Sequence, residues 1–352
     1  MLDKIYTARG SPNIALIKYW GRRDDALNLP NNSSISMTLD DNLNTTTSII
    51  FSDKIKSDAV YINGSRQDSG ALMSEKLSFT ISIINKMKEL AGTKSNFLMV
   101  SKNSFPSDVG LASSASGAAT LVYVANTALE LKLPGKELSK IARQISGSAC
   151  RSIFGGIVRW DRGLMPDGSD SFAEQIVPKE YWADLIDVIA ITSQSKKKVP
   201  SSEGHKITVK TSPLYRNRPS FAEDGVKRSI DAIKKKDFDT LAELIMRDSN
   251  NMHATMLDSW PPIMYLNDVS REIINAVDGL NKAHGQNVAA YTFDAGPNAH
   301  IITLQKHSAE IKEALSKIPG VQNVMVSEMG SGPSISEERL ISDEMLAANE
   351  TA

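Results

Sequence analysis

A strand-like run at residues 96–103 leads through a glycine- and serine-rich turn into a helix-like stretch that begins near Ser113. The junction, FPSDVGLASSASG at residues 105–117, predicts a helix that starts at the end of a sheet strand. The first N–H groups of that helix have no partners within it. Together with the helix dipole and the serine hydroxyls they favour the binding of phosphate oxygens. The alternative interpretation is a turn of small residues that only allows close packing of strand and helix.

The rest of the chain repeats this mixture of patterns. The first 65 residues alternate short β-rich runs with turns, which predicts antiparallel sheet. From Ser74 onward, apolar residues recur every three or four positions until Gly92, which predicts an amphipathic helix. A second helix is predicted between a Ser270 cap and Gly285. Strands are predicted at 45–51, 59–63, 96–103, 153–160, 187–193, 288–293, 300–305 and 323–329, and further helices at 113–131, 136–146, 223–247 and 308–318. These elements predict an α+β fold of two mixed layers.

A candidate domain boundary lies near 162–185. There RGLMPDGSD supplies Gly, Pro and Asp, and the strand pattern starts again at 187–193. With 352 residues, the chain is long enough for two domains of about 150 residues each. We therefore expect domains at residues 1–185 and 186–352, of which the first carries the phosphate-binding turn at 103–117.

Composition narrows the class of protein. The 40 Lys and Arg against 41 Asp and Glu give a formal net charge of −1, which argues against a nucleic-acid binder. The single cysteine, Cys150, cannot form an intramolecular disulfide, so we expect a reducing compartment. No uncharged run approaches about 18 residues, which argues against a membrane span. The five histidines form no HxxxH or HExxH pair, which argues against a metal hydrolase. We expect a cytoplasmic protein.

Lys18 stands in an otherwise apolar and aromatic segment, SPNIALIKYWGRRD, at residues 11–24. A lysine flanked by Leu-Ile and Tyr-Trp is a candidate for a partly desolvated cation that binds a carboxylate or a phosphate. The alternative is that the stem packs against apolar surface while the ammonium group reaches water.

Two further residues could carry chemistry. Arg151, in the small-residue segment SGSACRS, offers a planar fork that suits a bidentate grip on a carboxylate. Asp294 ends an apolar strand and precedes Gly296-Pro297, so a sharp turn would present its carboxylate at the rim of a sheet, a suitable place for a base. The alternatives are a surface arginine after a helix end and an aspartate that only caps a turn.

Five blocks of the sequence resemble the diphosphomevalonate decarboxylase family of the GHMP kinase superfamily. They occur in order along nearly the whole chain: SPNIALIKYWGRRD with NLPNNSSISMTLDD, FPSDVGLASSASG, SGSACRSIFGG, SWPPIMYLND and YTFDAGPN. The resemblance implies an N-terminal domain like ribosomal protein S5 domain 2, a ferredoxin-like C-terminal domain and a cleft between them. It also implies the reaction: MgATP phosphorylates the tertiary 3-hydroxyl of mevalonate 5-diphosphate, and that phosphate then leaves with carbon dioxide to give isopentenyl diphosphate.

The resemblance also implies roles for individual residues. Arg151 would hold the C1 carboxylate, Asp294 would orient or deprotonate the 3-hydroxyl, and Lys18 would keep Asp294 ionised. The presence of all three favours decarboxylation over the related mevalonate 3-kinases. Substrate binding would involve Asn13, Tyr19, Arg22, Ser148, Ser201 and His205. Nucleotide phosphates would bind at Asn103, Pro106, Ser107, Gly110, Leu111, Ala112, Ser113, Ser114 and Ser146. ATP and Mg²⁺ are expected as co-substrate and cofactor, without an assigned side-chain metal ligand, and a homodimer is expected.

The sequence departs from the family pattern in two places that keep alternatives open. Ser107-Asp108 stands where small uncharged residues are usual, and a carboxylate disfavours a nearby phosphate. VPSSEGH at residues 199–205 replaces a usual VSSxxGM. The alternatives are an ATP-independent decarboxylase of mevalonate 3,5-bisphosphate, an ATP-dependent decarboxylase of mevalonate 5-phosphate, and a non-catalytic module that binds phosphorylated ligands.

Overall fold

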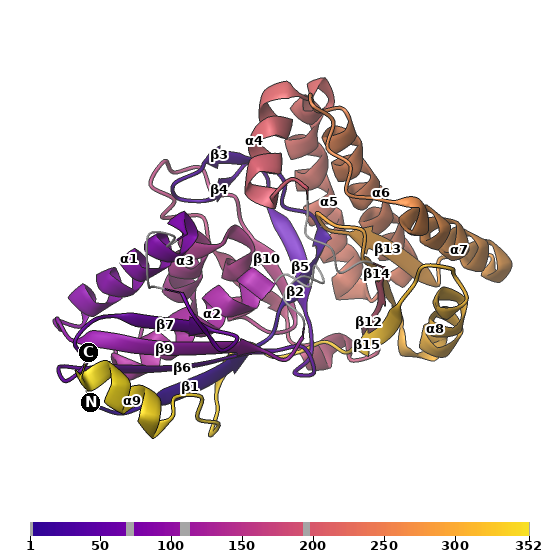
Figure 1. The fold of residues 1–352 in the computed structure, drawn as a ribbon. Coiled ribbons are helices and arrows are strands. Elements are labelled where there is room, and N and C mark those ends of the chain that lie inside the picture. The colour runs from indigo at the N-terminus through magenta and orange to yellow at the C-terminus, as the bar shows by residue number, and fades with distance from the viewer. Residues whose placement is uncertain (1–2, 68–73, 106–112, 193–197, 352) are drawn as a thin grey trace.

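The computed structural model describes residues 3–67, 74–105, 113–192 and 198–351. Figure 1 shows a mixed helix-and-sheet molecule in which the N-terminal half, in indigo and magenta, and the C-terminal half, in orange and yellow, lie side by side. Each half is built on sheets covered by helices, so the predicted α+β fold is confirmed. The domain limits at 185 and 186 stay a prediction.

The first sheet has six strands. Their order is β16 (Ser334–Ile335), β1 (Tyr6–Gly10), β6 (Thr45–Ser52), β9 (Asn96–Asn103), β7 (Ala59–Ile62) and β8 (Ser65–Arg66). The predicted strands at 45–51 and 59–63 are present, but the antiparallel expectation is wrong for β7, which pairs in parallel with β9. The reason is that the α-helix α1 (Glu75–Leu90) lies between β7 and β9 in the chain, and such a crossover lets two strands run in the same direction.

Helices cover both faces of this sheet. On one face, α1, α2 (Ser113–Ala128) and α3 (Gly135–Ile145) share a buried apolar cluster with β1, β6 and β9. On the other, Ile341 and α9 (Asp343–Thr351) pack on strand residues Ile50 and Leu98. The C-terminal segment therefore returns to the N-terminal sheet, and Figure 1 shows α9 in yellow beside β1.

A second sheet of four strands carries several of the predicted site residues. Its order is β11 (Ala173–Val177), β10 (Ile157–Trp160), β5 (Ser34–Thr38) and β2 (Asn13–Ile17), and β3 (Arg22–Asp24) pairs with β4 (Leu29–Pro30) beside it. The strand predicted at 153–160 begins only at Ile157. The chain before it forms a short 3₁₀ helix, η1 (Gly147–Ile153), since small residues such as Gly147 and Ala149 allow a tight turn of buried backbone.

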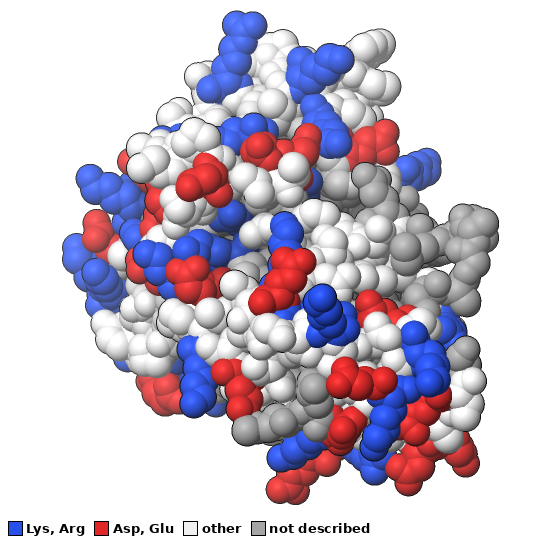
Figure 2. Space-filling model, turned by 90° about the vertical axis from the view of Figure 1, so that its left-hand side faces the viewer, with Lys and Arg blue, Asp and Glu red and all other residues white. Residues whose placement is uncertain are grey.

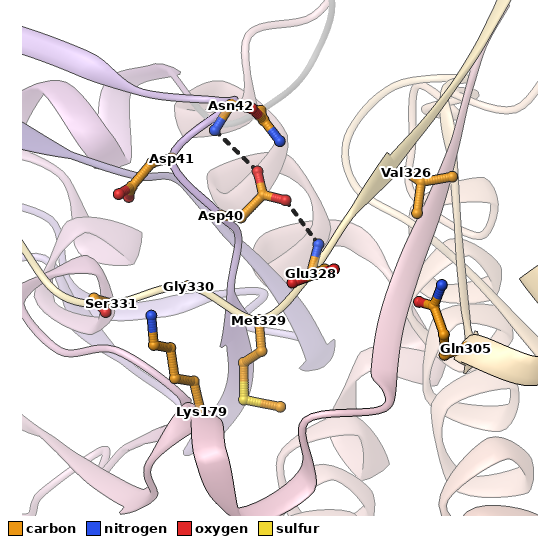
Figure 3. Close-up of a pocket in the computed structure, with 10 residues that line it drawn as sticks. All are labelled: Asp40, Asp41, Asn42, Lys179, Gln305, Val326, Glu328, Met329, Gly330 and Ser331. Atoms are coloured by element: carbon orange, nitrogen blue, oxygen red, sulfur yellow. Dashed lines mark hydrogen bonds between the residues drawn. The ribbon is translucent and has the colours of Figure 1, made fainter.

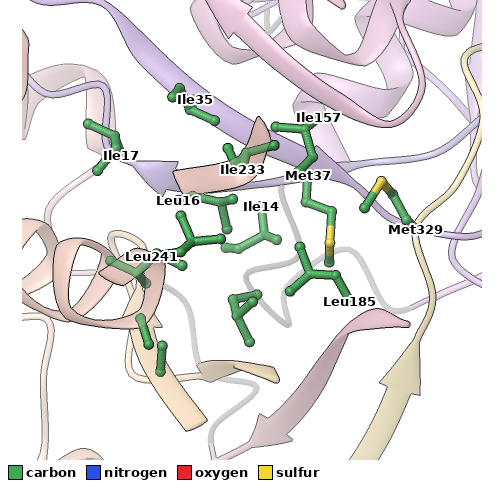
Figure 4. Close-up of a cluster of buried hydrophobic side chains, with 14 of the residues drawn as sticks. Ile14, Leu16, Ile17, Ile35, Met37, Ile157, Leu185, Ile233, Leu241 and Met329 are labelled. Carbon is green, nitrogen blue, oxygen red and sulfur yellow. The ribbon is translucent and has the colours of Figure 1, made fainter. Parts of the chain in front are cut away.

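The third sheet lies in the C-terminal half. Its order is β13 (Ala289–Phe293), β14 (Ala299–Leu304), β12 (Leu185–Ile191) and β15 (Asn323–Ser327), all antiparallel. On one face pack α7 (Asp268–His284) and α8 (Ser308–Ser316), which the one-turn 3₁₀ helix η4 (Gln305–His307) precedes. The other face meets α5 (Arg218–Lys235) and α6 (Phe238–Leu257) and the second sheet. Figure 4 shows this shared core, in which Ile14 and Leu16 of β2 lie near Leu241 of α6.

Two helix predictions need correction, and one helix was not predicted. The helix predicted at 223–247 is two helices, because Lys236 adopts a left-handed conformation with φ 54° and Asp237 caps α6. The helix predicted to start at a Ser270 cap has Asn267 as its N-cap instead. Ser270 is the third residue of this helix and completes the capping box, and Gly285 ends the helix as predicted. The segment VPSSEGH at 199–205, for which no helix was predicted, leads into the helix α4 (Ser201–Thr211), which has Pro200 at its N-cap.

The segment after β15 passes between the two halves of the molecule. Met329 bridges to Leu39, and the Gly330 N–H donates to the Thr38 carbonyl at 2.8 Å. A Cβ on Gly330 would lie 1.9 Å from the Leu39 carbonyl oxygen, so only glycine fits there. Figure 3 shows the polar hollow of about 430 Å³ next to this passage, with the Asp40 carboxylate accepting the Glu328 N–H.

The surface agrees with the near-zero net charge. Figure 2 shows basic and acidic side chains interspersed over the face drawn. None of the helices within the described ranges is long and apolar enough to cross a bilayer.

Candidate active site

Lys18 and Asp294 form an ion pair between the two halves of the molecule. Lys18 directly follows β2, Asp294 directly follows β13, and the Lys18 Nζ lies 2.7 Å from the Asp294 Oδ1. The Lys18 side chain is 2% exposed, whereas that of Asp294 is 33% exposed. The interpretation of Lys18 as an ammonium group that reaches water is therefore wrong. The cation is therefore buried, whereas the carboxylate that it contacts is partly exposed.

A second, fully buried ion pair holds the backbone of Lys18. The Arg218 guanidinium, at the start of α5, contacts the Asp248 carboxylate on α6 at 2.6 Å. Asp248 accepts the Lys18 backbone N–H at 2.7 Å, and Arg218 donates to the Lys18 carbonyl at 3.0 Å. Asn32 donates to the same carbonyl at 2.9 Å. Both polar groups of the Lys18 backbone are thus fixed by side chains, which fixes the point from which the ammonium group reaches Asp294.

Arg151 lies in η1 with only 3% of its surface exposed, so the surface-arginine interpretation is wrong. Its Nη1 donates to the Ser34 hydroxyl at 2.7 Å and its Nε to the Asn13 side-chain oxygen at 3.1 Å. Asn13 in turn donates to the Ser152 hydroxyl at 2.8 Å. Neutral partners therefore orient the fork.

The hydrogen-bond partners of Arg151 in the described part of the chain are uncharged. Burial lowers the pKa of the guanidinium, and the charge of Asp294 is among the weaker influences that raise it. An arginine nevertheless stays protonated in a protein. Over the described ranges, no carboxylate lies at ion-pair distance from Arg151. A buried, oriented and unpaired guanidinium favours the binding of an anion from outside the chain.

In the segment from Tyr19 to Arg22, aromatic rings and one arginine contact one another. Arg22 Nε donates to the Tyr19 hydroxyl at 2.6 Å, and burial raises the pKa of Tyr19 to about 12. His205 stacks on Trp20 with ring centroids 4.2 Å apart and accepts the Gly21 N–H at 2.7 Å. Burial, followed by the Arg22 charge, lowers the pKa of His205 well below its usual value, so the ring is neutral and can accept this bond.

The predicted phosphate-binding residues are only partly described. Residues 106–112, which include Pro106, Ser107, Gly110, Leu111 and Ala112, lie outside the described residues, as does the discordant Asp108. Ser113 is the first residue of α2. The Ser114 and Ser146 hydroxyls lie 3.4 Å apart, so the start of α2 and the end of α3 bring together two of the predicted hydroxyls.

The remaining predicted residues occupy separate places. The Ser148 carbonyl accepts from Asn13 at 3.2 Å, which places Ser148 beside Arg151. The Asn103 side-chain oxygen, at the end of β9, accepts from Thr45. Ser201 starts α4, one turn before His205. Their roles stay predictions.

Two family models match the chain. Residues 10–173 match the diphosphomevalonate decarboxylase-like N-terminal domain, and residues 187–345 match the mevalonate 5-diphosphate decarboxylase C-terminal domain. The chain belongs to the diphosphomevalonate decarboxylase family. The two matches together cover most of its length, so the family resemblance in the sequence is confirmed.

Relatives in this family are similar over nearly the whole chain. Diphosphomevalonate decarboxylase mvd1 of Aspergillus fumigatus is 44% identical over 329 residues, which cover 89% of this chain and 80% of that protein. The crystal structure of mevalonate diphosphate decarboxylase from Staphylococcus aureus superposes with a TM-score of 0.86 at 35% identity, over 95% of this chain and 98% of that one. The structure of MDDEF in complex with MVAPP, AMPPCP and magnesium has a TM-score of 0.84 at 35% identity, over 95% and 99%.

The ion pair of Arg218 and Asp248 was missed by the sequence reasoning, although a signal for it exists. Asp248 falls on the apolar face of its helix, at helical spacing from Leu244 and Met252. A carboxylate on a buried face needs a partner, which points to a structural or positioning pair. The sequence gives no indication that its partner is Arg218, 30 residues away.

Proposed function

We propose that this member of the diphosphomevalonate decarboxylase family uses ATP to convert mevalonate 5-diphosphate into isopentenyl diphosphate, carbon dioxide, ADP and phosphate. The observation that carries the proposal is the buried Arg151 guanidinium, which has no carboxylate in contact among the residues that the structure describes. The buried Lys18 ammonium group and the partly exposed Asp294 carboxylate form the second element of the proposed site. Arg151 thus provides a cation for the C1 carboxylate of the substrate, and Asp294 provides a carboxylate for its 3-hydroxyl.

The first half of the reaction needs a base beside the tertiary 3-hydroxyl. The Asp294 carboxylate is partly exposed and therefore accessible to a hydroxyl group. The ammonium group of Lys18, at 2.7 Å, stabilises the ionised carboxylate. We assign to Asp294 the orientation or deprotonation of the 3-hydroxyl as the oxygen attacks the phosphoryl group of ATP.

In the second half of the reaction, the C1–C2 bond breaks while the new 3-phosphate leaves. Positive charge develops at C3 as the phosphate departs, and the electrons of the carboxylate bond fill the forming double bond. The C1 carboxylate must be held in one plane during this step. We assign that task to Arg151, whose fork is already oriented by Ser34 and Asn13.

For the nucleotide, the described residues offer a suitable end of helix α2. The helix is 16 residues long and has no acidic residue in its first turn. No carboxylate of that turn therefore repels a phosphate group from the positive end of the helix dipole. The paired hydroxyls of Ser114 and Ser146 add hydrogen-bond donors. The MDDEF complex with AMPPCP and magnesium supports the assignment of MgATP as co-substrate. Mg²⁺ would neutralise phosphate charge, and we assign no side chain of this protein as its ligand.

A product assay tests the proposal. The purified protein is incubated with mevalonate 5-diphosphate, mevalonate 5-phosphate or mevalonate 3,5-bisphosphate, each with and without MgATP, and ADP and carbon dioxide are measured. We expect both products only from mevalonate 5-diphosphate with MgATP. Carbon dioxide from the bisphosphate without nucleotide, carbon dioxide only from the 5-phosphate, or binding without turnover would each replace the proposal by one of the three alternatives.

Replacement of Arg151 by lysine should lower kcat/KM at least about tenfold. Lysine keeps the positive charge but loses the bonds to Ser34 and Asn13 and cannot grip a carboxylate with two parallel donors. Steady-state kinetics with mevalonate 5-diphosphate measure the effect. Arg228→Lys is the control, because Arg228 is half-exposed and pairs with Asp224 on the same helix. Equal values of kcat/KM for the two variants would show that Arg151 does not hold the substrate carboxylate.

Homodimer formation and a cytoplasmic location stay predictions. They rest on the family resemblance and on the single cysteine, respectively. Cys150 is buried, and burial raises the pKa of its thiol to about 12, so it stays protonated and does not serve as a nucleophile.

A further inference from the structure

Two histidines and a glutamate converge at the edge of the C-terminal sheet, outside the site described above. His284 is the last residue of α7, His307 ends η4, and Glu310 lies in the first turn of α8. The strand β13 follows α7 and β14 precedes η4. Because Ala289 pairs with Thr303 in this antiparallel pair, the register places the end of α7 beside the start of α8. The fold therefore sets this cluster.

The donor atoms of the cluster are close enough for one ion. The ligand atoms of His284, His307 and Glu310 all lie within 4.8 Å of one another. The His284 Nε2 lies 3.0 Å and 3.1 Å from the two Glu310 carboxylate oxygens. Zn–N and Zn–O bonds of about 2.0–2.2 Å give a tetrahedral edge of about 3.4 Å. One edge is thus nearly formed, and rotation of the partly exposed side chains closes the others.

The two imidazole rings are also arranged as they are around a shared metal. Their centroids lie 5.3 Å apart and their planes are inclined by 78°. A ring nitrogen about 2.0–2.1 Å from zinc places the centroid about 3.2 Å from the ion, so two rings at tetrahedral positions have centroids about 5 Å apart. The observed separation matches this value. Throughout the described residues, the His307 ring has this ring contact but no hydrogen-bond partner.

We propose that His284, His307 and Glu310 bind one Zn²⁺ ion, with water as the fourth ligand. Two neutral imidazoles and one carboxylate form a donor set that suits Zn²⁺, whereas Mg²⁺ prefers oxygen ligands. The ion joins the end of α7 to the start of α8, two helices whose apolar side chains share one buried cluster. Its function is to stabilise the C-terminal half of the protein.

The zinc site is separate from the decarboxylation site. His284 precedes β13, whereas Asp294 follows the other end of the same strand. Five strand residues at about 3.3 Å each span roughly 16 Å. Loss of the zinc ligands should therefore leave kcat unchanged, which makes the test independent of the proposed reaction.

Zinc chloride titrated into the full-length protein, without nucleotide and against a chromophoric chelator, tests the site. We expect saturable binding of one Zn²⁺ per chain and a rise in Tm with zinc concentration. His284→Ala and Glu310→Gln should each weaken the affinity at least about tenfold and abolish the rise in Tm. Co²⁺ in place of Zn²⁺ should give visible ligand-field absorption that is lost in the same variants.

Glu313→Gln is the matched control, because Glu313 lies on the same helix, is 70% exposed and pairs with Lys317. This variant should bind zinc as the wild type does. The ligand residues are at the surface, so their variants are expected to fold, and Tm without zinc checks this. Absence of saturable binding to the wild type, or an affinity that is the same in the wild type and both ligand variants, overturns the proposal.

Discussion

Replacement of Asp294 by asparagine is expected to lower kcat by at least about a hundredfold, a loss typical of removing an acid–base group. The amide has nearly the same shape as the carboxylate, so substrate binding should change much less than turnover. It cannot take up a proton from the 3-hydroxyl, and it leaves the buried Lys18 ammonium group without its anionic partner. Steady-state rates of ADP and carbon dioxide formation measure the effect, together with the Kd of mevalonate 5-diphosphate.

A surface pair of the same kind is the control for Asp294. The Asp278 carboxylate contacts the Lys282 ammonium group at 2.6 Å, but their side chains are 57% and 75% exposed. Asp278→Asn removes the same charge from an aspartate–lysine pair and should leave kcat within experimental error. A loss of less than threefold in Asp294→Asn contradicts a catalytic role for this carboxylate.

Replacement of Asp248 by alanine should cause the largest loss of stability among these variants. Breaking a buried ion pair by removing one partner costs about 3–5 kcal/mol, because the remaining charge stays buried without compensation. Here the Arg218 guanidinium, which is fully buried, would lose its carboxylate partner. The Lys18 backbone N–H would also lose its acceptor. Tm by scanning calorimetry and the urea midpoint measure the change.

The conservative change Asp248→Asn separates stability from positioning. The amide oxygen can still accept the Lys18 N–H, so we expect a smaller loss of stability than in Asp248→Ala, and kcat to fall with KM nearly unchanged as the Lys18–Asp294 geometry loosens. Asp224→Ala is the control, because that carboxylate is 65% exposed and lies 3.6 Å from its arginine. If Asp248→Ala were no less stable than Asp224→Ala, the buried pair would not hold this part of the structure.

Local patterns were enough to predict most of the elements. Apolar runs predicted β6, β9 and the strands of the C-terminal sheet. β6 and β12 are buried along their whole length, and β9 is buried from Phe97 to Val100. The break between α5 and α6 was missed because Lys234 to Lys236 continue the helical charge pattern. The signal for a new helix lay in the next residues, where Asp237 is the N-cap of α6 and its side chain accepts the Thr240 N–H. Helix ends depend on such single side chains, whereas helix interiors depend on many.

The side chains proposed to be catalytic were predicted singly, but their contacts were not predictable from local sequence. Lys18 and Asp294 are 276 residues apart, and only the meeting of β2 with β13 across the core places them at 2.7 Å. The contacts within the cluster proposed to bind zinc were not predictable from local sequence either. A search for paired histidines along the chain fails because the ligands of this cluster come from the ends of α7, η4 and α8.

The central claim is that one substrate molecule reaches both Arg151 and Asp294. A crystal structure of the protein with bound mevalonate 5-diphosphate tests it most directly. We predict that the C1 carboxylate lies about 2.7–3.2 Å from the Arg151 guanidinium nitrogens and that the 3-hydroxyl lies within the same range of an Asp294 oxygen. A substrate bound with its carboxylate away from Arg151, or with its hydroxyl out of reach of Asp294, would contradict the account.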